Sequence, residues 1–175
     1  ADHELNPSTF AVRVCASTGA SLPAALLSGT ATLSGPRHGG VAPLARRALS
    51  AALDDRLDAF LASPEGKNPY GFGFGHPLYP EGDPRARLIL ERLPPHGSIH
   101  MAVTRLGNRL GLAPNVDCAL AALSEAHALP DDAAFAIFAI GRMTGWIAHA
   151  IEQASSRNII RPRARFIAED GTAES

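Results

Sequence analysis

Apolar side chains recur along the chain at the three- and four-residue spacing of a helix. The clearest stripe lies between residues 44 and 60, with charged side chains mostly opposite, and consists of Leu44, Ala48, Leu49, Ala52, Leu53, Leu57 and Phe60. This spacing predicts one amphipathic helix of about five turns. Valine, isoleucine and threonine never alternate with polar residues over a convincing run, so no strand is predicted. The chain is therefore expected to be all-α.

Start and stop signals divide the rest of the chain into further helices. Asparagine, serine or aspartate precedes several apolar runs, as at a helix N-cap, and glycine or proline follows them. The predicted helices begin after Asn6 and end at Gly19, begin near Ser21 and end by Gly35, and cover 83–93, 98–110 and 115–123. Residues 63–82 contain too many glycines and prolines for a regular element. Such a long loop tends to be functional.

The longest apolar stretch, residues 133–150, approaches the length that crosses a membrane. Arg142 stands in its middle and His149 near its end, and both side chains are costly in hydrocarbon. Large apolar side chains lie on nearly every side of this helix, which favours the central core helix of a soluble protein. The tail after residue 157 lacks a helical stripe and is expected to extend over a neighbour.

Composition and charge narrow the class of protein. With 175 residues, 46% of them hydrophobic, the chain can bury a core and is expected to form one compact unit. A net charge of -1 without a long basic run argues against nucleic acid or an anionic membrane as partner. Cys15 and Cys118 show no CxxC spacing, so both are expected to be reduced thiols in a cytoplasmic protein. The first residue is Ala1 rather than Met, which fits processing or a fragment.

Three side chains are candidates for acid–base chemistry on a carbonyl. His38 lies in a Gly-Pro-Arg-His-Gly-Gly loop, where a substrate could approach the imidazole, although an ordinary turn fits equally well. His76 ends a glycine-rich run that lacks the lysine of a phosphate-binding loop. Asp117 lies at the mouth of an apolar helix, where desolvation could raise its pKa; a helix N-cap is the simpler interpretation. A carboxylate base and two imidazoles suit a condensation on a thioester.

Two arginines are candidates for binding an anionic substrate. Arg142, in the most apolar helix, must pair with a buried anion or face a polar cavity, so a structural ion pair and a clamp on a substrate carboxylate both fit. Arg85 lies in the first turn of a predicted helix near His76, although it could equally be a surface side chain. His96 and His100 have no obvious third ligand, so no metal site is predicted, and no cofactor-binding motif is present.

Six motifs in a fixed order together resemble the carboxyl-terminal part of citrate synthase, across about residues 1–167. They are residues 1–6, 35–40, 73–76, 83–85, 115–117 and 141–146. The resemblance implies an all-α enzyme that closes on oxaloacetate and condenses it with acetyl-CoA, without a metal, to give citrate and CoA. It also implies a division into part of the large domain (1–40), the small domain with a helix returning to the large domain (41–150), and a carboxyl-terminal tail (151–175).

The resemblance implies roles for the three acid–base candidates. His38 resembles the family's histidine that hydrogen-bonds the enolising acetyl group. Asp117 resembles the base that removes the methyl proton, and His76 resembles the histidine on the carbonyl of oxaloacetate. All three would therefore be catalytic.

The resemblance also implies a set of residues that bind substrate carboxylates. His3, Arg85 and Arg142 resemble this set. Arg161, or Arg163 two residues later, resembles the arginine that reaches the active site of a partner subunit. The expected working unit is therefore a homodimer with shared sites, or a pairing with an amino-terminal chain.

Two departures from the family pattern leave alternatives open. Where the family continues after its Gly-His loop with basic residues that serve CoA phosphate, this chain reads Pro77-Leu78-Tyr79-Pro80-Glu81, which is expected to weaken CoA binding. The chain also begins at the His3 motif, whereas family members have a large amino-terminal portion, so a fragment, a split pair or a shortened relative is expected. The alternatives are a 2-methylcitrate synthase, a citryl-CoA lyase-like enzyme, and a catalytically impaired regulatory module that binds a dicarboxylate.

Overall fold

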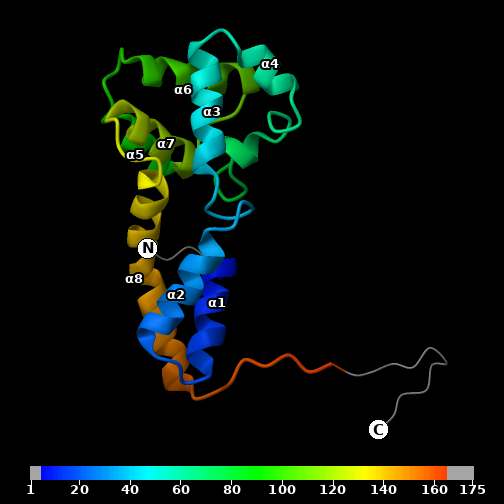
Figure 1. The fold of residues 1–175 in the computed structure, drawn as a ribbon, viewed down its shortest axis with the longest axis vertical. Coiled ribbons are helices and arrows are strands. Elements are labelled where there is room, and N and C mark those ends of the chain that lie inside the picture. The colour runs from blue at the N-terminus through cyan, green and yellow to red at the C-terminus, as the bar shows by residue number, and fades with distance from the viewer. Residues whose placement is uncertain (1–4, 165–175) are drawn as a thin grey trace, which may run out of the picture.

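The computed structural model describes residues 5–164, which form two lobes built from helices (Figure 1). One lobe consists of α1 (Pro7–Ser17), α2 (Leu22–Leu33) and α8 (Ala133–Ser156). The other consists of α3 (Ala42–Leu53), α4 (Leu57–Ala62), the 3-10 helix η1 (Pro69–Phe72), α5 (Pro84–Leu90), α6 (Ser98–Leu110) and α7 (Val116–Ala126). Within residues 5–164 the only β pairing is an isolated bridge between Phe74 and Pro114. The all-α prediction is confirmed.

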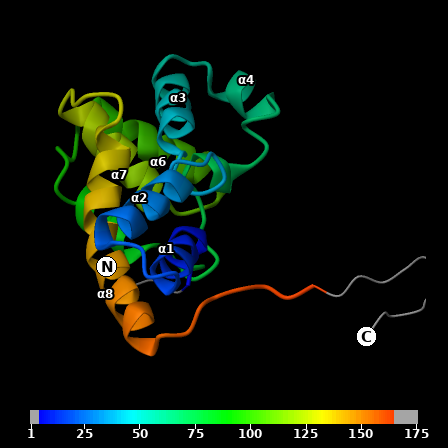
Figure 2. The same cartoon turned by 60° about the horizontal axis from the view of Figure 1, so that its bottom comes forward.

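The first lobe is a helical hairpin packed on the long helix α8. Figure 2 shows α1 and α2 running beside each other and α8 next to them. Val12 and Trp146 are fully buried at this junction. Gly29 permits the close approach, because a Cβ there would lie 2.6 Å from Val12 Cγ2 and 3.1 Å from the Trp146 ring. The predicted N-cap Asn6 is confirmed, since its side chain accepts a hydrogen bond from the Thr9 amide at 3.0 Å.

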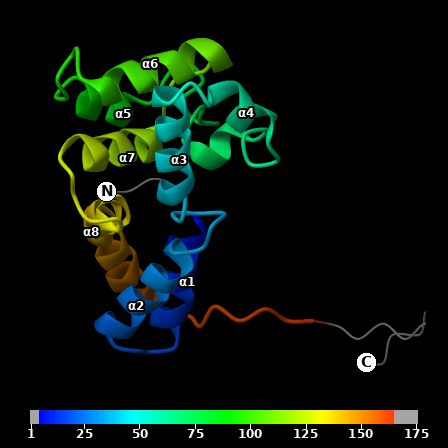
Figure 3. The ribbon, with the colours of Figure 1, turned by 45° about the horizontal axis from the view of Figure 1, so that its top comes forward.

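The second lobe has its own apolar core around α3, α6 and α7. Phe72, Phe74, Leu49 and Leu106 are almost completely buried there. Figure 3 shows α6 on the side of this lobe away from the hairpin, with α7 nearer to it. Phe72 and Phe74 come from the segment 63–82, which was expected to hold no regular element. That expectation was wrong for residues 69–72, because burial of Phe72 fixes them as a 3-10 turn.

The predicted five-turn helix between residues 44 and 60 is two helices. The break lies between α3 and α4, where Asp55 adopts a left-handed backbone with φ of 53°. Aspartate is a poor helix former but tolerates this conformation, and Asp54 forms an ion pair with Arg56 at 2.6 Å across the turn. Leu57 and Phe60 still pack on the core of the lobe. The apolar residues of α3 and α4 therefore pack on the same core although the chain changes direction between the two helices, and spacing alone did not predict this change.

Helix α8 runs from one lobe to the other and is only partly covered. Trp146 and Arg142 are buried, but Ile140 is 66% exposed and Ile151 is 58% exposed. The prediction of a helix buried on nearly every side was therefore wrong for this chain. By length and composition α8 could cross a membrane, a test that core helices also pass. Its buried face packs on α1 and α2, as in a core helix.

After α8 the chain is extended, as predicted, through residue 164. Arg157 ends the helix with a left-handed φ of 55°. The Ile160 amide then donates to Ser17 Oγ at 3.0 Å, and the Gln153 side chain donates to the Asn158 carbonyl at 2.9 Å. These two contacts tie the start of the tail to the hairpin lobe. That the tail covers a neighbouring chain stays a prediction.

Candidate active site

A cavity of about 340 Å³ lies where the loop after α2, the loop before α5 and the start of α7 meet. His38, His76, Arg85 and Asp117 all line it. The remaining lining residues are Asn6, Pro7, Leu33, Arg37, Gly39, Tyr70, Pro77, Leu78, Val116 and Phe138. Four of the candidates taken from separate sequence motifs therefore share one site.

A larger hollow of about 800 Å³ lies over α4 and α6 but contains none of these candidates. Its two arginines, Arg105 and Arg109, form exposed ion pairs with Asp55 and Asp58. It is also more open to solvent than the smaller cavity. The smaller cavity is therefore the candidate active site, because it combines partly buried acid–base groups with an enclosed volume.

The Asp117 side chain lines the cavity from the first turn of α7, but Asp117 is not the N-cap of that helix. The N-cap is Asn115, whose side chain accepts from the Asp117 amide at 2.9 Å and donates to the Gly75 carbonyl at 3.0 Å. The interpretation of Asp117 as an N-cap was therefore wrong. Burial raises the pKa of Asp117 to about 6, the charge of Arg85 lowers it and that of Asp83 raises it. A carboxylate with this pKa is ionised at pH 7 and is more basic than an exposed aspartate.

His38 reaches the cavity from the turn after α2. Its Nε2 lies 2.9 Å from Ser8 Oγ, and Ser8 in turn donates to Asn6 Oδ1 at 2.9 Å. Burial and, second, the charge of Arg142 lower the pKa of His38 below 6.5. The imidazole is therefore neutral at pH 7 and can donate from only one ring nitrogen.

His76 lies between two tyrosine rings on the opposite loop. Its ring centroid is 6.3 Å from that of Tyr70 and 5.0 Å from that of Tyr79. The Leu78 amide donates to His76 Nδ1 at 3.2 Å. In the neutral ring the proton is therefore on Nε2, which makes that nitrogen a hydrogen-bond donor.

Arg85 is held at the cavity by Asp83, so its interpretation as a surface side chain was wrong. Arg85 Nε donates to Asp83 Oδ1 at 2.9 Å, and Nη2 donates to Oδ2 at 2.8 Å. The guanidinium carbon also lies 5.4 Å from the centre of the Tyr79 ring. Sequence reasoning identified Asp83 only as a helix cap; the Asp-Pro-Arg spacing was the signal for this bidentate pair.

Arg142 is buried in the middle of α8, as the sequence required of a charge in an apolar helix. It donates to Thr9 Oγ1 on α1, and it is close enough to His38 to lower that pKa. It is not among the residues that line the cavity, so the structure places it near the site and does not assign its function.

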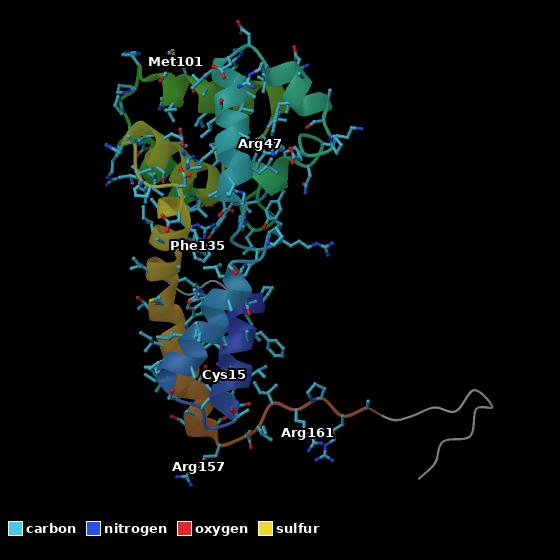
Figure 4. The ribbon with its side chains drawn as sticks, viewed as in Figure 1. Cys15, Arg47, Met101, Phe135, Arg157 and Arg161 are labelled. Atoms are coloured by element: carbon cyan, nitrogen blue, oxygen red, sulfur yellow. The ribbon has the colours of Figure 1, made fainter. Side chains whose placement is uncertain are left out.

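For two of the proposed substrate-binding residues, His3 and Arg161, the structure shows no place at the cavity within residues 5–164. His3 lies outside the described residues. Arg161 is exposed on the extended tail, and Figure 4 shows it at the far end of the hairpin lobe from Phe135. Its predicted role was in the site of a partner subunit and stays a prediction. Between residues 5 and 164 no group of three or more side chains could hold a metal ion.

Gly73 joins the His76 loop to α7, and this contact leads to a stability prediction. Its φ is +93°, its carbonyl accepts from the Asn115 amide at 2.8 Å, and a Cβ would lie 2.5 Å from the Cys118 amide nitrogen. We expect Gly73→Ala to lower the free energy of unfolding by about 3 kcal/mol or more, because backbone strain and overpacking add. Chemical denaturation measures this loss.

Gly75→Ala is the matched control for this prediction. Gly75 also has a positive φ, +76°, but an alanine methyl group there would meet no atom closer than Leu112 Cδ1, at 3.8 Å. Only the strain of about 1–2 kcal/mol is expected at this position. Equal losses in the two variants would contradict the tight contact between Gly73 and α7.

Comparison with known proteins identifies the family. The sequence model for the carboxyl-terminal domain of citrate synthase matches residues 1–163. The chain belongs to the citrate synthase family. Citrate synthase from Haloferax volcanii is 36% identical over 97% of this chain and 48% of its own length. The 2-methylcitrate synthase from Shewanella oneidensis is 33% identical over 95% of this chain and 48% of its own length.

A solved structure agrees with this membership. The ternary complex of citrate synthase from Thermoplasma acidophilum with carboxymethyl coenzyme A and oxaloacetate superposes with a TM-score of 0.77 at 30% identity, covering 95% of this chain and 49% of that one. The chain thus spans about half the length of the curated citrate synthases it matches.

Proposed function

We propose that the protein condenses acetyl-CoA with oxaloacetate to citrate and CoA, with the 340 Å³ cavity as the active site. The observation that carries this proposal is the meeting of His38, His76, Arg85 and Asp117, from four separate motifs, around one cavity in a member of the citrate synthase family. The solved relative from Thermoplasma acidophilum holds a CoA derivative and oxaloacetate, which fits the proposed substrate classes.

Asp117 acts as the base that removes a methyl proton from the thioester. Its pKa of about 6 makes it a stronger base than an exposed aspartate while it stays ionised at pH 7. Removal of the proton forms an enolate, whose oxygen needs a hydrogen-bond donor in the same step. His38 supplies this donor from Nδ1 when the Ser8 hydroxyl turns from Asn6 and donates to Nε2, across the 2.9 Å that separates Ser8 Oγ from Nε2.

His76 and the arginines hold the second substrate. The Nε2 proton of His76 donates to the ketone oxygen of oxaloacetate, which polarises the carbon that the enolate attacks. Arg85 Nη1 makes no hydrogen bond within residues 5–164, because Asp83 engages Nε and Nη2, and it therefore receives a substrate carboxylate. Arg142 binds the other carboxylate in this proposal.

The hairpin lobe exposes several large apolar side chains. Leu27, Ile140 and Ile151 are 69%, 66% and 58% exposed on α2 and α8. Such apolar side chains gathered on one lobe favour a partner surface. We propose that it is covered by the portion that citrate synthases have in addition to this segment, on the same chain or a separate one, in an assembly with a second copy.

Thiol release from acetyl-CoA in the presence of oxaloacetate tests the proposed reaction. The protein is assayed alone and after mixing with the amino-terminal half of a citrate synthase, and calorimetry measures binding of each substrate. We expect oxaloacetate-dependent release of CoA. Absence of both oxaloacetate binding and thiol release in both samples would contradict the proposal. Oxaloacetate binding without CoA binding would instead support the regulatory module.

The preferred acyl chain is tested by comparing kcat/KM for acetyl-CoA and propionyl-CoA. The 2-methylcitrate synthase from Shewanella oneidensis shares nearly as much identity with this chain as the citrate synthase from Haloferax volcanii, so the family alone does not decide. We expect acetyl-CoA to be preferred about 10- to 200-fold, the range that one methylene commands in an apolar pocket. The reverse preference would assign the 2-methylcitrate synthase activity.

A further inference from the structure

Asp83 joins two elements of the cavity through one buried carboxylate. Its side chain is completely buried. Oδ1 accepts hydrogen bonds from the Arg85 amide at 3.0 Å and from Arg85 Nε at 2.9 Å. Oδ2 accepts from Arg85 Nη2 at 2.8 Å and from the Val116 amide, on α7, at 2.9 Å. The same carboxylate therefore caps α5, orients the Arg85 guanidinium and holds the start of α7.

We propose that Asp83 is a positioning residue for the reaction, which fixes the Arg85 guanidinium relative to Asp117. Asp117 directly follows Val116, whose amide Asp83 accepts, so the carboxylate holds both groups through contacts of 2.9 Å or less. The inference rests on the proposed condensation, in which Arg85 binds a carboxylate of oxaloacetate and Asp117 removes the proton. Asp83 itself touches no substrate.

The negative charge of Asp83 is as important as its shape. Burial raises its pKa, but the hydrogen bonds and charge of Arg85 outweigh this effect, so the pKa lies below 3.8 and the group is ionised. Asparagine would present an NH₂ group to donors that now meet an oxygen, so it cannot satisfy all of them. Arg85 would then be free to leave its present position at the cavity.

The same charge also acts on Asp117. Arg85 lowers the pKa of Asp117 and Asp83 raises it, so the paired aspartate offsets the acidifying effect of the arginine. The other charged or titratable groups that line the cavity are Arg37, His38, Tyr70 and His76. Removal of the charge at 83 takes away the effect of Asp83 and releases Arg85, so the pKa of Asp117 should shift from about 6.

Asp83→Asn tests the proposal through two independent measurements. Carbon-13 NMR of labelled aspartate carboxyls follows the titration of Asp117, whose resonance is assigned by its loss in Asp117→Asn. Calorimetry measures oxaloacetate binding. We expect the Asp117 pKa to shift and oxaloacetate affinity to drop about 10- to 100-fold, because a charge-assisted contact loses its fixed geometry. Asp58→Asn, which breaks the exposed pair with Arg109, is the matched control and should change neither quantity.

Val116→Pro tests the hydrogen bond from the Val116 amide to Asp83 separately from the ion pair between Asp83 and Arg85. It also provides a test if Asp83→Asn fails to fold. Proline suits the first position of a helix, and the extended backbone of Asn115, with ψ of -177°, suits a residue before proline. This variant removes the amide that links Asp83 to α7 and keeps an apolar side chain at this buried position. We expect it to shift the Asp117 titration and to reduce oxaloacetate affinity less than Asp83→Asn does, because the ion pair between Asp83 and Arg85 is kept.

The outcomes separate this inference from the proposed function. A shifted Asp117 titration in a protein that binds no oxaloacetate would uphold the coupling of Asp83 to Asp117 and contradict the condensation. Normal oxaloacetate binding and an unchanged Asp117 titration in folded Asp83→Asn would overturn the positioning role and leave the condensation intact. An unchanged titration in Val116→Pro would overturn the link to α7.

Discussion

Asp117→Asn is expected to slow CoA release about 100- to 10,000-fold while it makes the folded protein more stable at pH 8. The loss of rate follows from removal of the only carboxylate that lines the cavity within the described residues. Asparagine has nearly the same shape and keeps the start of α7 capped by Asn115, so substrate binding should change little. A fall in kcat with little change in KM is the expected pattern.

The stability gain follows from the pKa of the same group. The pKa of Asp117 is about 6 in the folded protein against 3.8 unfolded, so the folded state binds its proton more tightly. Its contribution is therefore fully present below about pH 3.8 and is lost as pH rises through about 6. At pH 8 the ionised group costs about 1–3 kcal/mol, allowing for its partial exposure, and asparagine removes that cost.

Urea denaturation of both proteins at pH 8 and pH 4 measures this gain. The difference in the free energy of unfolding should be present at pH 8 and nearly absent at pH 4, where the aspartate is protonated in the folded state. Asp58→Asn, at an exposed carboxylate, is the control and should show no such gain at pH 8. If Asp117→Asn were less stable than wild type at both pH values, the ionised Asp117 carboxylate would not destabilise the folded protein, and the prediction would be wrong.

The helices were predictable where local signals fix them. The side chain of Asn6 and the proline after it specify the start of α1, and Gly19, with φ of +80°, specifies its end. The break after α3 was not predictable from spacing, because both halves keep their apolar residues on the same core. The exposed side of α8 was not predictable either, because Ile140 is as apolar as the buried residues of the helix and its exposure depends on which faces α1 and α2 cover.

The candidate site was predictable as a set of motifs but not as a network of contacts. Local sequence left an ordinary turn open for His38, a surface side chain for Arg85 and an N-cap for Asp117, and only the ordered set of motifs pointed to a common site, which the structure brings together. The partner of Arg85 was missed because a cap and an ion pair share the same Asp-Pro-Arg pattern. The contact between Ser8 and His38 joins residues 30 positions apart, and no local signal indicates it.

Arg142→Gln is expected to weaken oxaloacetate binding about 10- to 100-fold and to raise the pKa of His38. The first effect follows if Arg142 binds a substrate carboxylate, because glutamine lacks the charge and the paired donors. The second follows from the present balance at His38, whose pKa is lowered by burial and, second, by the charge of Arg142. Without that charge only burial lowers the pKa, so His38 becomes protonated at a higher pH.

Arg142→Lys separates these two effects, because lysine keeps the positive charge but lacks the planar pair of donors. It should leave the pKa of His38 low, as followed by proton NMR of the ring, while oxaloacetate affinity in calorimetry falls nearly as far as in Arg142→Gln. The acid limb of the rate profile should then move to higher pH only in Arg142→Gln, because catalysis needs neutral His38. An unchanged oxaloacetate affinity in both folded variants would show that buried Arg142 serves the packing of α8 on Thr9 rather than the substrate.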